Sequence, residues 1–204
     1  MKQVNRLAQG GRIDRSRPIK FKFNNKELEG FAGDTLASAL LANGVNIVNR
    51  SFKYSRARGI VAAGAEEPNA VVQIGSAESE QVPNVRATQQ ALYPGLDARS
   101  TNGWPGVELD LMSVVGKVGG RFMPPGFYYK TFMKPESMWM TYEKYIRKGA
   151  GLGRAPLERD ADIYDHMNRH CEVLVIGGGP AGLAAALAAG QSGVRVILAD
   201  EQEE

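Results

Sequence analysis

Near residue 180 the sequence holds a glycine-rich turn between two apolar runs, VLVIGGGPAGLAAALAAG followed by VRVILAD. The apolar run at residues 173–176 is typical of a buried strand, and the Ala-rich stretch from about Ala181 is typical of a helix. A second apolar run leads to Asp200. Strand, glycines, helix and strand in this order predict the first βαβ unit of a Rossmann-type α/β dinucleotide-binding domain.

The spacing G-x-G-x-x-G gives each glycine of this turn a physical role. Gly177 permits a tight turn, Gly179 lets the backbone approach a pyrophosphate, and Gly182 allows the helix to pack closely on the sheet. The N–H groups at the start of the helix attract the same pyrophosphate. Asp200 follows Gly182 by 18 residues, close to the usual separation for a carboxylate that binds a ribose.

The acidic end of this segment favours one nucleotide over another. Asp200 and Glu201 place negative charge where the extra phosphate of NADP would lie, so we expect NAD rather than NADP. FAD is the alternative, because the same glycine spacing serves both cofactors. The uncharged stretch 173–190 is long enough to cross a membrane, but three glycines followed by a proline make a poor spanning helix. We therefore expect no membrane segment.

A second stretch, RGIVAAGAEEPNAVVQIG at residues 58–75, has the outline of an iron–sulfur loop that leads into a strand. The plant-type ligand spacing C-x4-C-x2-C falls on Ala62, Glu67 and Ala70. The sequence has one cysteine, Cys171, which excludes a cluster held only by cysteines. We therefore predict no iron–sulfur cluster, no iron and no metal site. His166 and His170, four residues apart, are a weak zinc signal without a third ligand.

The segment before this loop predicts a small α+β unit. The pattern IKFKFNNKELEGF alternates on both sides of Asn24 and Asn25, as in a β-hairpin. In GDTLASALLANG, Asp34 is a candidate N-cap of a helix over about residues 35–43, and Gly44 is its stop signal. The helix would present an apolar stripe of Leu36, Leu40 and Leu41. Hairpin, helix and a further strand suggest one helix packed across a sheet.

Charge and composition argue against a nucleic-acid-binding protein and against a secreted one. Residues 1–60 hold 12 Lys and Arg against 4 Asp and Glu, with a dense basic patch at 50–58. Because no nucleic-acid-binding motif surrounds that patch, we expect a solvated loop or a face for an acidic partner, and no nucleic acid. The polar N-terminus is not a secretory signal, which suggests a cytoplasmic protein. Residues 92–165 show little periodicity, and we interpret their Met and aromatic residues as packing groups.

Eight short motifs are similar to one protein family. They are GRIDRSRP, GDTLASALLANGV, RSFKYSRARGI, EEPNAVVQIG, PNVRAT, GFYYKTFM, GAGLGRAP and VLVIGGGPAGLAAALAA. With them the chain resembles the N-terminal part of the alpha subunit of the heterotetrameric sarcosine oxidase family. The resemblance implies a ferredoxin-like β-grasp domain without a cluster at residues 15–100, with Thr88 at the fourth ligand position. An irregular connecting segment at 101–165 and an incomplete dinucleotide-binding domain at 166–204 would follow.

The resemblance also implies an activity. Such enzymes demethylate sarcosine oxidatively to glycine, produce hydrogen peroxide and pass a one-carbon unit to tetrahydrofolate. NAD would lie in this subunit, FAD and FMN elsewhere in a complex with beta, gamma and delta subunits, and no catalytic residue would lie in this chain, which alone would be inactive. The implied binding residues are Gly177, Gly178, Gly179, Ala181, Gly182, Asp200 and Glu201. The alternatives are a non-catalytic β-grasp docking module and a subunit of a related FAD-dependent amino-acid or opine dehydrogenase.

Overall fold

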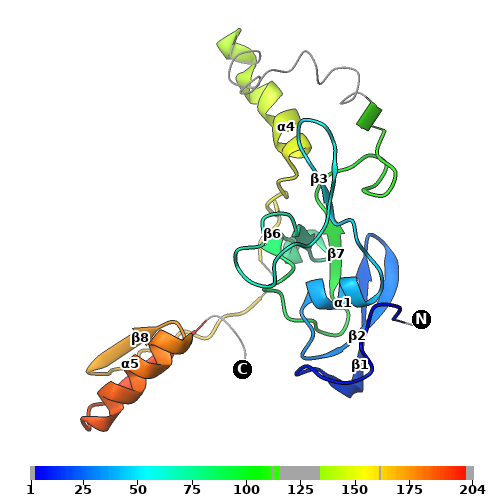
Figure 1. Cartoon of the computed structure of the whole chain (residues 1–204). Helices are drawn as coiled ribbons and strands as arrows, with labels where there is room; N and C mark the ends of the chain where they lie inside the picture. The colour runs from blue at the N-terminus through cyan, green and yellow to red at the C-terminus, as the bar shows by residue number, and fades with distance from the viewer. Residues whose placement is uncertain (1–2, 112, 115–133, 161, 201–204) are drawn as a thin grey trace. The chain divides into compact units, whose positions relative to one another are not determined.

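A computed structural model describes residues 3–111, 113–114, 134–160 and 162–200. The chain divides into two compact units, residues 1–161 and residues 162–204 (Figure 1). The first unit contains most of the strands, and the second is a single strand–helix–strand unit. Each unit is described by itself.

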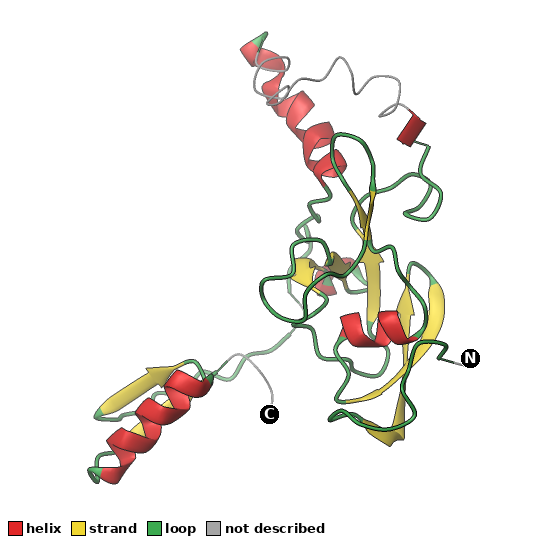
Figure 2. Ribbon diagram, in the orientation of Figure 1, coloured by secondary structure: helices red, strands yellow, loops and turns green. Residues whose placement is uncertain are grey.

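The first unit is built on a mixed sheet of five strands. The order across the sheet is β2-β1-β7-β5-β6, with β1 and β7 parallel and the other neighbours antiparallel. The strands are β1 (Asp14–Phe23), β2 (Lys26–Ala32), β5 (Val71–Ile74), β6 (Val82–Arg86) and β7 (Asp97–Ser100). One helix, α1 (Leu36–Ala42), lies across this sheet (Figure 2). This arrangement is that of a β-grasp fold, as the sequence predicts.

The hairpin of β1 and β2 turns at the predicted pair of asparagines. Phe23 pairs with Lys26, which leaves Asn24 and Asn25 as the two turn residues. Both have positive φ, 49° and 64°, the conformation that a two-residue type I′ turn requires and that asparagine tolerates well. The predicted hairpin is therefore confirmed.

Helix α1 forms where expected, but its N-cap differs from the prediction. Thr35 is the N-cap, and its side chain and that of Ser38 form a reciprocal capping box. The Asp34 carboxylate accepts hydrogen bonds from Arg6 and from the Ser38 hydroxyl, and the contact with Arg6 is one that sequence spacing cannot reveal. Gly44 follows the helix with φ of 77°, as its predicted stop role requires.

The core of the first unit lies between α1 and the sheet. Alternate residues of β1 and the inner face of α1 supply nearly half of its buried residues. The buried members on these two elements are Ile19, Phe21, Phe23, Leu36, Ala37, Ala39 and Leu40. Leu41, placed by the sequence in the same stripe, is 38% exposed. The buried face of the helix is completed by Ala37, Ala39 and Ala42 instead of Leu41.

Shorter elements complete the first unit. They are β3 (Asn49–Arg50), β4 (Ala57–Arg58), and the 3-10 turns η1 (Glu78–Glu80) and η3 (Glu136–Met138). Helix α4 (Trp139–Ala150) forms within the segment expected to be irregular. It ends at Gly151, whose φ is 77°, and Gly149 packs against the Phe52 ring. Residues 115–133, which include the motif GFYYKTFM, lie outside the described residues.

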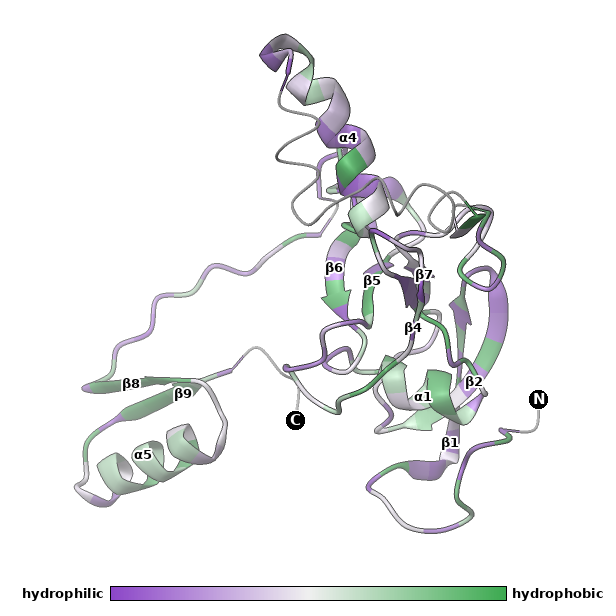
Figure 3. Ribbon diagram, turned by 45° about the horizontal axis from the view of Figure 1, so that its top comes forward, coloured by the Kyte–Doolittle hydropathy of each residue, from purple (hydrophilic) through white to green (hydrophobic). Residues whose placement is uncertain are grey.

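The second unit is the predicted strand–helix–strand unit. It consists of β8 (Val173–Ile176), α5 (Pro180–Gln191) and β9 (Val196–Ala199). The two strands are parallel and pair residue for residue from Val173 with Val196 to Ile176 with Ala199. Figure 3 shows both strands and the helix in hydrophobic colours. Among the described residues, no helix is long and apolar enough to cross a membrane.

Candidate functional site

The turn after β8 has the backbone that the first glycine of the motif predicts. Gly177 has φ of 104°, a conformation that a side chain would strain. Its N–H donates to the carbonyl of Ala199 at 2.8 Å, which fixes the turn to the end of β9. The turn therefore begins at the carboxyl ends of both parallel strands, where nucleotides bind in folds of this type.

Gly182 packs more tightly than any other described glycine. A Cβ at this position would lie 1.8 Å from the Gly177 carbonyl oxygen and 3.4 Å from a methyl carbon of Val175. The third glycine therefore lets α5 pack against the turn itself as well as against β8. This agrees with the close packing that the motif predicts.

The N-terminus of α5 is open toward the turn. Gly179 is the N-cap residue, Pro180 is the first helical residue, and no side chain caps the helix. A Cβ on Gly179 would meet no atom within 4 Å. Ala181 lies exposed in the first helical turn. Free N–H groups, the positive end of the helix dipole and open space together fit the pyrophosphate of a dinucleotide.

Asp200 lies beside the glycine turn, as the motif predicts. It follows β9 directly, and its carboxylate accepts a hydrogen bond from the N–H of Gly178. This contact places an acidic side chain at the edge of the turn, within the same unit as Gly179. Glu201, the other acidic candidate, lies outside the described residues.

In the first unit, residues 60–70 fold around the side chain of Glu67. Its Oε2 accepts hydrogen bonds from the N–H groups of Val61 at 2.7 Å and Ala62 at 2.6 Å. Its Oε1 accepts from Asn69 at 2.7 Å and Ala70 at 3.2 Å. Three of the positions picked out by the iron–sulfur spacing, 62, 67 and 70, therefore meet at one carboxylate.

Glu67 is 1% exposed, yet its environment keeps the carboxylate charged. Burial acts to raise the pKa of Glu67, but the four backbone N–H donors outweigh it and lower the pKa below its ordinary value. Thr88 lies at the same loop and donates from its hydroxyl to the Gly64 carbonyl at 2.8 Å. Thr88, at the fourth position of the iron–sulfur ligand spacing, therefore also stabilises this loop.

The basic segment at residues 50–58 is partly structural. Arg50 donates to the carbonyls of Val107, Ser55 and Glu108 at 2.7, 3.0 and 3.1 Å. Ser55 is buried and donates from its hydroxyl to Asp110. Arg50 is therefore a structural residue, because its guanidinium binds backbone carbonyls of the loop at residues 105–110.

Lys53 and Arg56, also in this segment, lie over the ring of Tyr54, each 4.9 Å from the ring centroid. They remain at the surface, as a solvated loop would require.

Sequence reasoning missed a buried ion pair near the N-terminus. Arg6 contacts Asp34 with two parallel hydrogen bonds of 3.0 and 2.6 Å, and its guanidinium lies 5.2 Å from the Phe31 ring centroid. Burial acts to raise the pKa of Asp34, but bonds from Arg6, Ser38 and the Phe31 N–H lower it overall. The sequence gives no local signal for this pair, because Arg6 and Asp34 are 28 residues apart.

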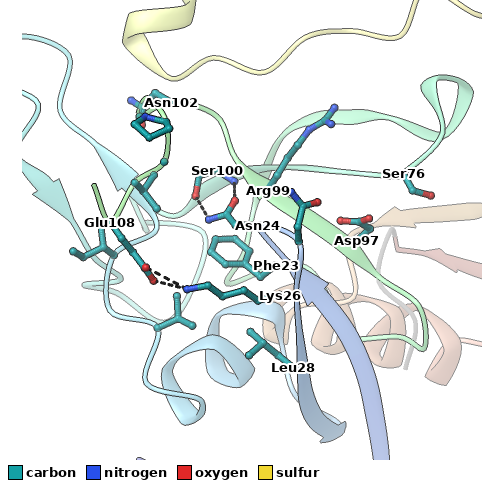
Figure 4. A pocket seen from close by; sticks show the side chains of 18 residues that line it. Phe23, Asn24, Lys26, Leu28, Ser76, Asp97, Arg99, Ser100, Asn102 and Glu108 are labelled. Carbon is teal, nitrogen blue, oxygen red and sulfur yellow. Dashed lines mark hydrogen bonds and ion pairs between the residues drawn. The ribbon is translucent and has the colours of Figure 1, made fainter. Parts of the chain in front are cut away.

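A hollow of the first unit lies beside the β1–β2 turn and has a volume of about 480 Å³. Figure 4 shows Asn24 facing Ser100 and Lys26 facing Glu108 across it. Asn24 and Ser100 exchange hydrogen bonds of 3.0 and 2.9 Å, and Lys26 pairs with Glu108 at 3.0 Å. These polar groups are engaged with one another, so we assign the hollow no reaction.

The two histidines do not share a helix face. His166 and His170 lie in an exposed segment without regular structure. Among the described residues, no group of three His, Cys, Asp or Glu is placed to hold a metal ion. The weak zinc signal of the sequence gains no support from the structure.

Two protein families match separate parts of the chain. Residues 16–103 match the family described as "2Fe-2S iron-sulfur cluster binding domain". Residues 172–204 match the family described as "FAD dependent oxidoreductase". The first match covers the five-stranded sheet and α1, and the second covers the glycine turn with its flanking strands.

These matches correct the predicted cofactors. Residues 16–103 match a cluster-binding family, which contradicts the prediction that the chain carries no iron–sulfur cluster. Residues 172–204 match a family of FAD-dependent oxidoreductases, which favours FAD, the alternative given above, over NAD. Motif spacing alone could not separate NAD from FAD, because both present the same pyrophosphate to the turn.

The residues at the cluster positions do not fit the thiolate ligands of such a cluster. These positions hold Ala62, Glu67, Ala70 and Thr88, and the Glu67 carboxylate is engaged by backbone N–H groups. Cys171 is the one cysteine of the sequence and lies outside the matched range. We therefore assign no chemical step in this chain to a cluster.

Two curated relatives match almost the whole chain. "Sarcosine oxidase subunit alpha" of Rhizobium meliloti (strain 1021) is 53% identical over 96% of the chain, which spans 20% of that relative. The protein of the same name from Corynebacterium sp. (strain U-96) is 32% identical over 96% of the chain and 15% of its own length. The resemblance predicted from the motifs is confirmed.

One solved structure is a weaker match. The crystal structure of L-proline dehydrogenase from P. horikoshii aligns with 91% of this chain and 25% of its own, at 19% identity and a TM-score of 0.40. That likeness is too low to support a conclusion about this protein.

Proposed function

Because this chain matches sarcosine oxidase alpha subunits along nearly all of its length, we propose that it acts as part of the alpha subunit of a flavin-dependent sarcosine oxidase. It spans 15–20% of the length of those relatives, so the reaction belongs to a larger assembly. We further propose beta, gamma and delta subunits as its partners.

The observation that carries this proposal is the geometry of the turn between β8 and α5. Gly177, Gly179 and Gly182 leave an open, uncapped helix N-terminus, and this segment matches FAD-dependent oxidoreductases. We propose that FAD binds here, with its pyrophosphate at the N–H groups of Gly179, Ala181 and Gly182, while the N–H of Gly178 holds the Asp200 carboxylate beside the turn. Asp200 would accept hydrogen bonds from the adenosine ribose.

Each of these residues would act by binding and orientation. The helix N-terminus offsets the negative charge of the pyrophosphate, and the absence of side chains on the glycines lets the backbone approach it. FAD, when bound, supplies a two-electron acceptor for an amine substrate. We assign no residue of this unit an acid or base role in the reaction.

The proposed overall reaction is the oxidative demethylation of sarcosine to glycine. Molecular oxygen would accept the electrons and form hydrogen peroxide, and the one-carbon unit would pass to tetrahydrofolate. The chain alone would not carry out this reaction, because the other subunits and most of the length of its relatives would be needed.

Measurement of sarcosine-dependent hydrogen peroxide production tests this proposal. An alpha subunit of the relatives' full length that contains this chain is expressed with the three partner subunits, this chain is expressed alone, and glycine is measured as the product. We expect production by the assembly and none by the chain alone. An assembly that oxidises another secondary amine but not sarcosine would refute the proposal that sarcosine is the substrate. Turnover by the chain alone would refute the proposal that the reaction needs the other subunits.

A further inference from the structure

The loop at residues 60–70 presents an unusual concentration of backbone donors to a single side chain. The N–H groups of Val61, Ala62, Asn69 and Ala70 all point at the Glu67 carboxylate, at 2.6 to 3.2 Å. Two donors come from before Glu67 in the sequence and two from after it. The loop thus closes around its own carboxylate.

The electrostatics of this arrangement resemble those of an anion-binding site. Successive backbone N–H groups that converge on one point form a concavity that favours negative charge. Iron–sulfur clusters receive hydrogen bonds at their sulfurs in the same way, and this loop lies within the range that matches a cluster-binding family. In this chain, however, the negative charge is supplied by Glu67, which is 1% exposed.

The loop is also tied to the core of the first unit. Ala70 is fully buried and its carbonyl accepts from the N–H of Ala87 at 2.9 Å, while Thr88 donates to Gly64. The strand β5 begins at the next residue, Val71. A change in the loop conformation would therefore reach the sheet through β5.

We propose that Glu67 is a built-in anion that organises the 60–70 loop, at the positions on which the plant-type ligand spacing of an iron–sulfur cluster falls. On removal of the Glu67 carboxylate, the converging N–H groups become a site for a small carboxylate such as formate. This inference concerns the first unit and does not depend on the proposed oxidase activity.

Amide hydrogen exchange of the full chain, followed residue by residue by NMR, tests the proposal. In the wild-type chain, the four N–H groups should be protected from exchange. In Glu67→Ala they should exchange about ten-fold faster or more, the factor expected for loss of even one charge-assisted hydrogen bond. The control is Glu66→Gln, which removes the adjacent and exposed charge and should leave all four rates unchanged.

Glu67→Gln sharpens the test because an amide keeps one acceptor oxygen. Val61 and Ala62 share one oxygen of Glu67, and Asn69 and Ala70 share the other. One pair should therefore stay protected while the other exchanges faster. Equal behaviour of all four amides would contradict the division of the donors between the two oxygens.

Chemical rescue separates an anion site from ordinary packing. Formate should restore protection in Glu67→Ala, whereas formamide, its neutral counterpart of similar size, should not. Rescue by both would show that filled volume matters rather than charge, and rescue by neither would show that no site is formed. If Glu67→Ala does not fold, the amide exchange rates of Glu67→Gln and of the wild-type chain test the proposal instead. Lack of protection of the four amides in the wild-type chain would overturn it.

Discussion

At the residue scale, Gly182, which has no side chain, and the buried carboxylates of Asp34 and Glu67 have the clearest structural roles. Gly182 has a backbone oxygen where a Cβ would stand, so its role can be tested without reference to any ligand. Asp34 and Glu67 are buried carboxylates that stay charged because arginine, hydroxyl and backbone donors surround them. Spacing alone singles out Gly182, whereas the arginine partner of Asp34 lies 28 positions away in the sequence.

Gly182→Ala should disorder the second unit. Alanine has the higher helix propensity by about 1 kcal/mol, but that gain cannot offset a Cβ placed 1.8 Å from the Gly177 oxygen. We expect faster amide exchange throughout α5, measured by mass spectrometry. Gly190→Ala is the matched control, since a Cβ there meets nothing within 4 Å and should slow exchange slightly. A Gly182→Ala unit that exchanges like the wild type would show that the turn relaxes without cost.

Acid should destabilise the first unit. The folded-state pKa values of Asp34 and Glu67 lie below the ordinary values of 3.8 and 4.5. Their stabilisation is therefore complete above those ordinary values and is lost as the pH falls through the lowered ones. Urea unfolding followed by the fluorescence of Trp104 and Trp139 should give a smaller free energy of unfolding at pH 3 than at pH 7. An equal free energy at both pH values would contradict the environments described for these carboxylates.

At the scale of elements, the sequence correctly predicts those turns, helix ends and strands that interactions between neighbouring residues determine. The Asn24–Asn25 turn, the stop at Gly44 and the unit from β8 to β9 form as predicted because turn geometry and apolar periodicity specify them. Helix α4 was missed because it buries no residue and has no side-chain cap. Gly151 after two basic residues was the signal that would have marked its end.

The N-cap of α1 shows how a distant contact overrides a local rule. Asp34 is a good capping residue by type, but its carboxylate binds Arg6 and leaves the cap to Thr35. Thr35→Ala should therefore lower the free energy of unfolding of the first unit by about 1 kcal/mol. Thr141→Ala, an exposed threonine of α4 that caps no helix, controls for the substitution type. A loss no larger than that of the control would mean that Asp34 replaces Thr35 as the cap.

At the scale of the whole molecule, the chain is two compact units joined by an exposed segment. Residues 162–170 have no regular structure and are exposed, and the second unit leaves Ile176 82% exposed and Leu187 65% exposed. The first unit has a continuous core between α1 and the sheet. The predicted boundaries at residues 100 and 165 remain predictions, since the division of the structure speaks only to residue 161.

Limited trypsin digestion should cut this joining segment first. Arg159 and Arg169 are exposed and lie where no strand or helix protects the backbone. We expect the second unit to be degraded before the strands of the first, as identified by mass spectrometry of the fragments. First cuts within β1 or β2 would contradict the description of the first unit as the more stable one.

The central claim is that the turn between β8 and α5 binds FAD, and the FAD content of the assembled protein tests it most directly. Gly179→Val should fold normally, because its Cβ meets no atom within 4 Å, but its side chain would block the approach of the pyrophosphate. The assembly is purified with this variant, with Gly190→Ala as control, and with the wild type, and the cofactors released on denaturation are quantified by chromatography. We predict that Gly179→Val lowers the FAD content and that Gly190→Ala retains it. Unchanged FAD in the Gly179→Val assembly, or NAD as the released nucleotide, would contradict the account.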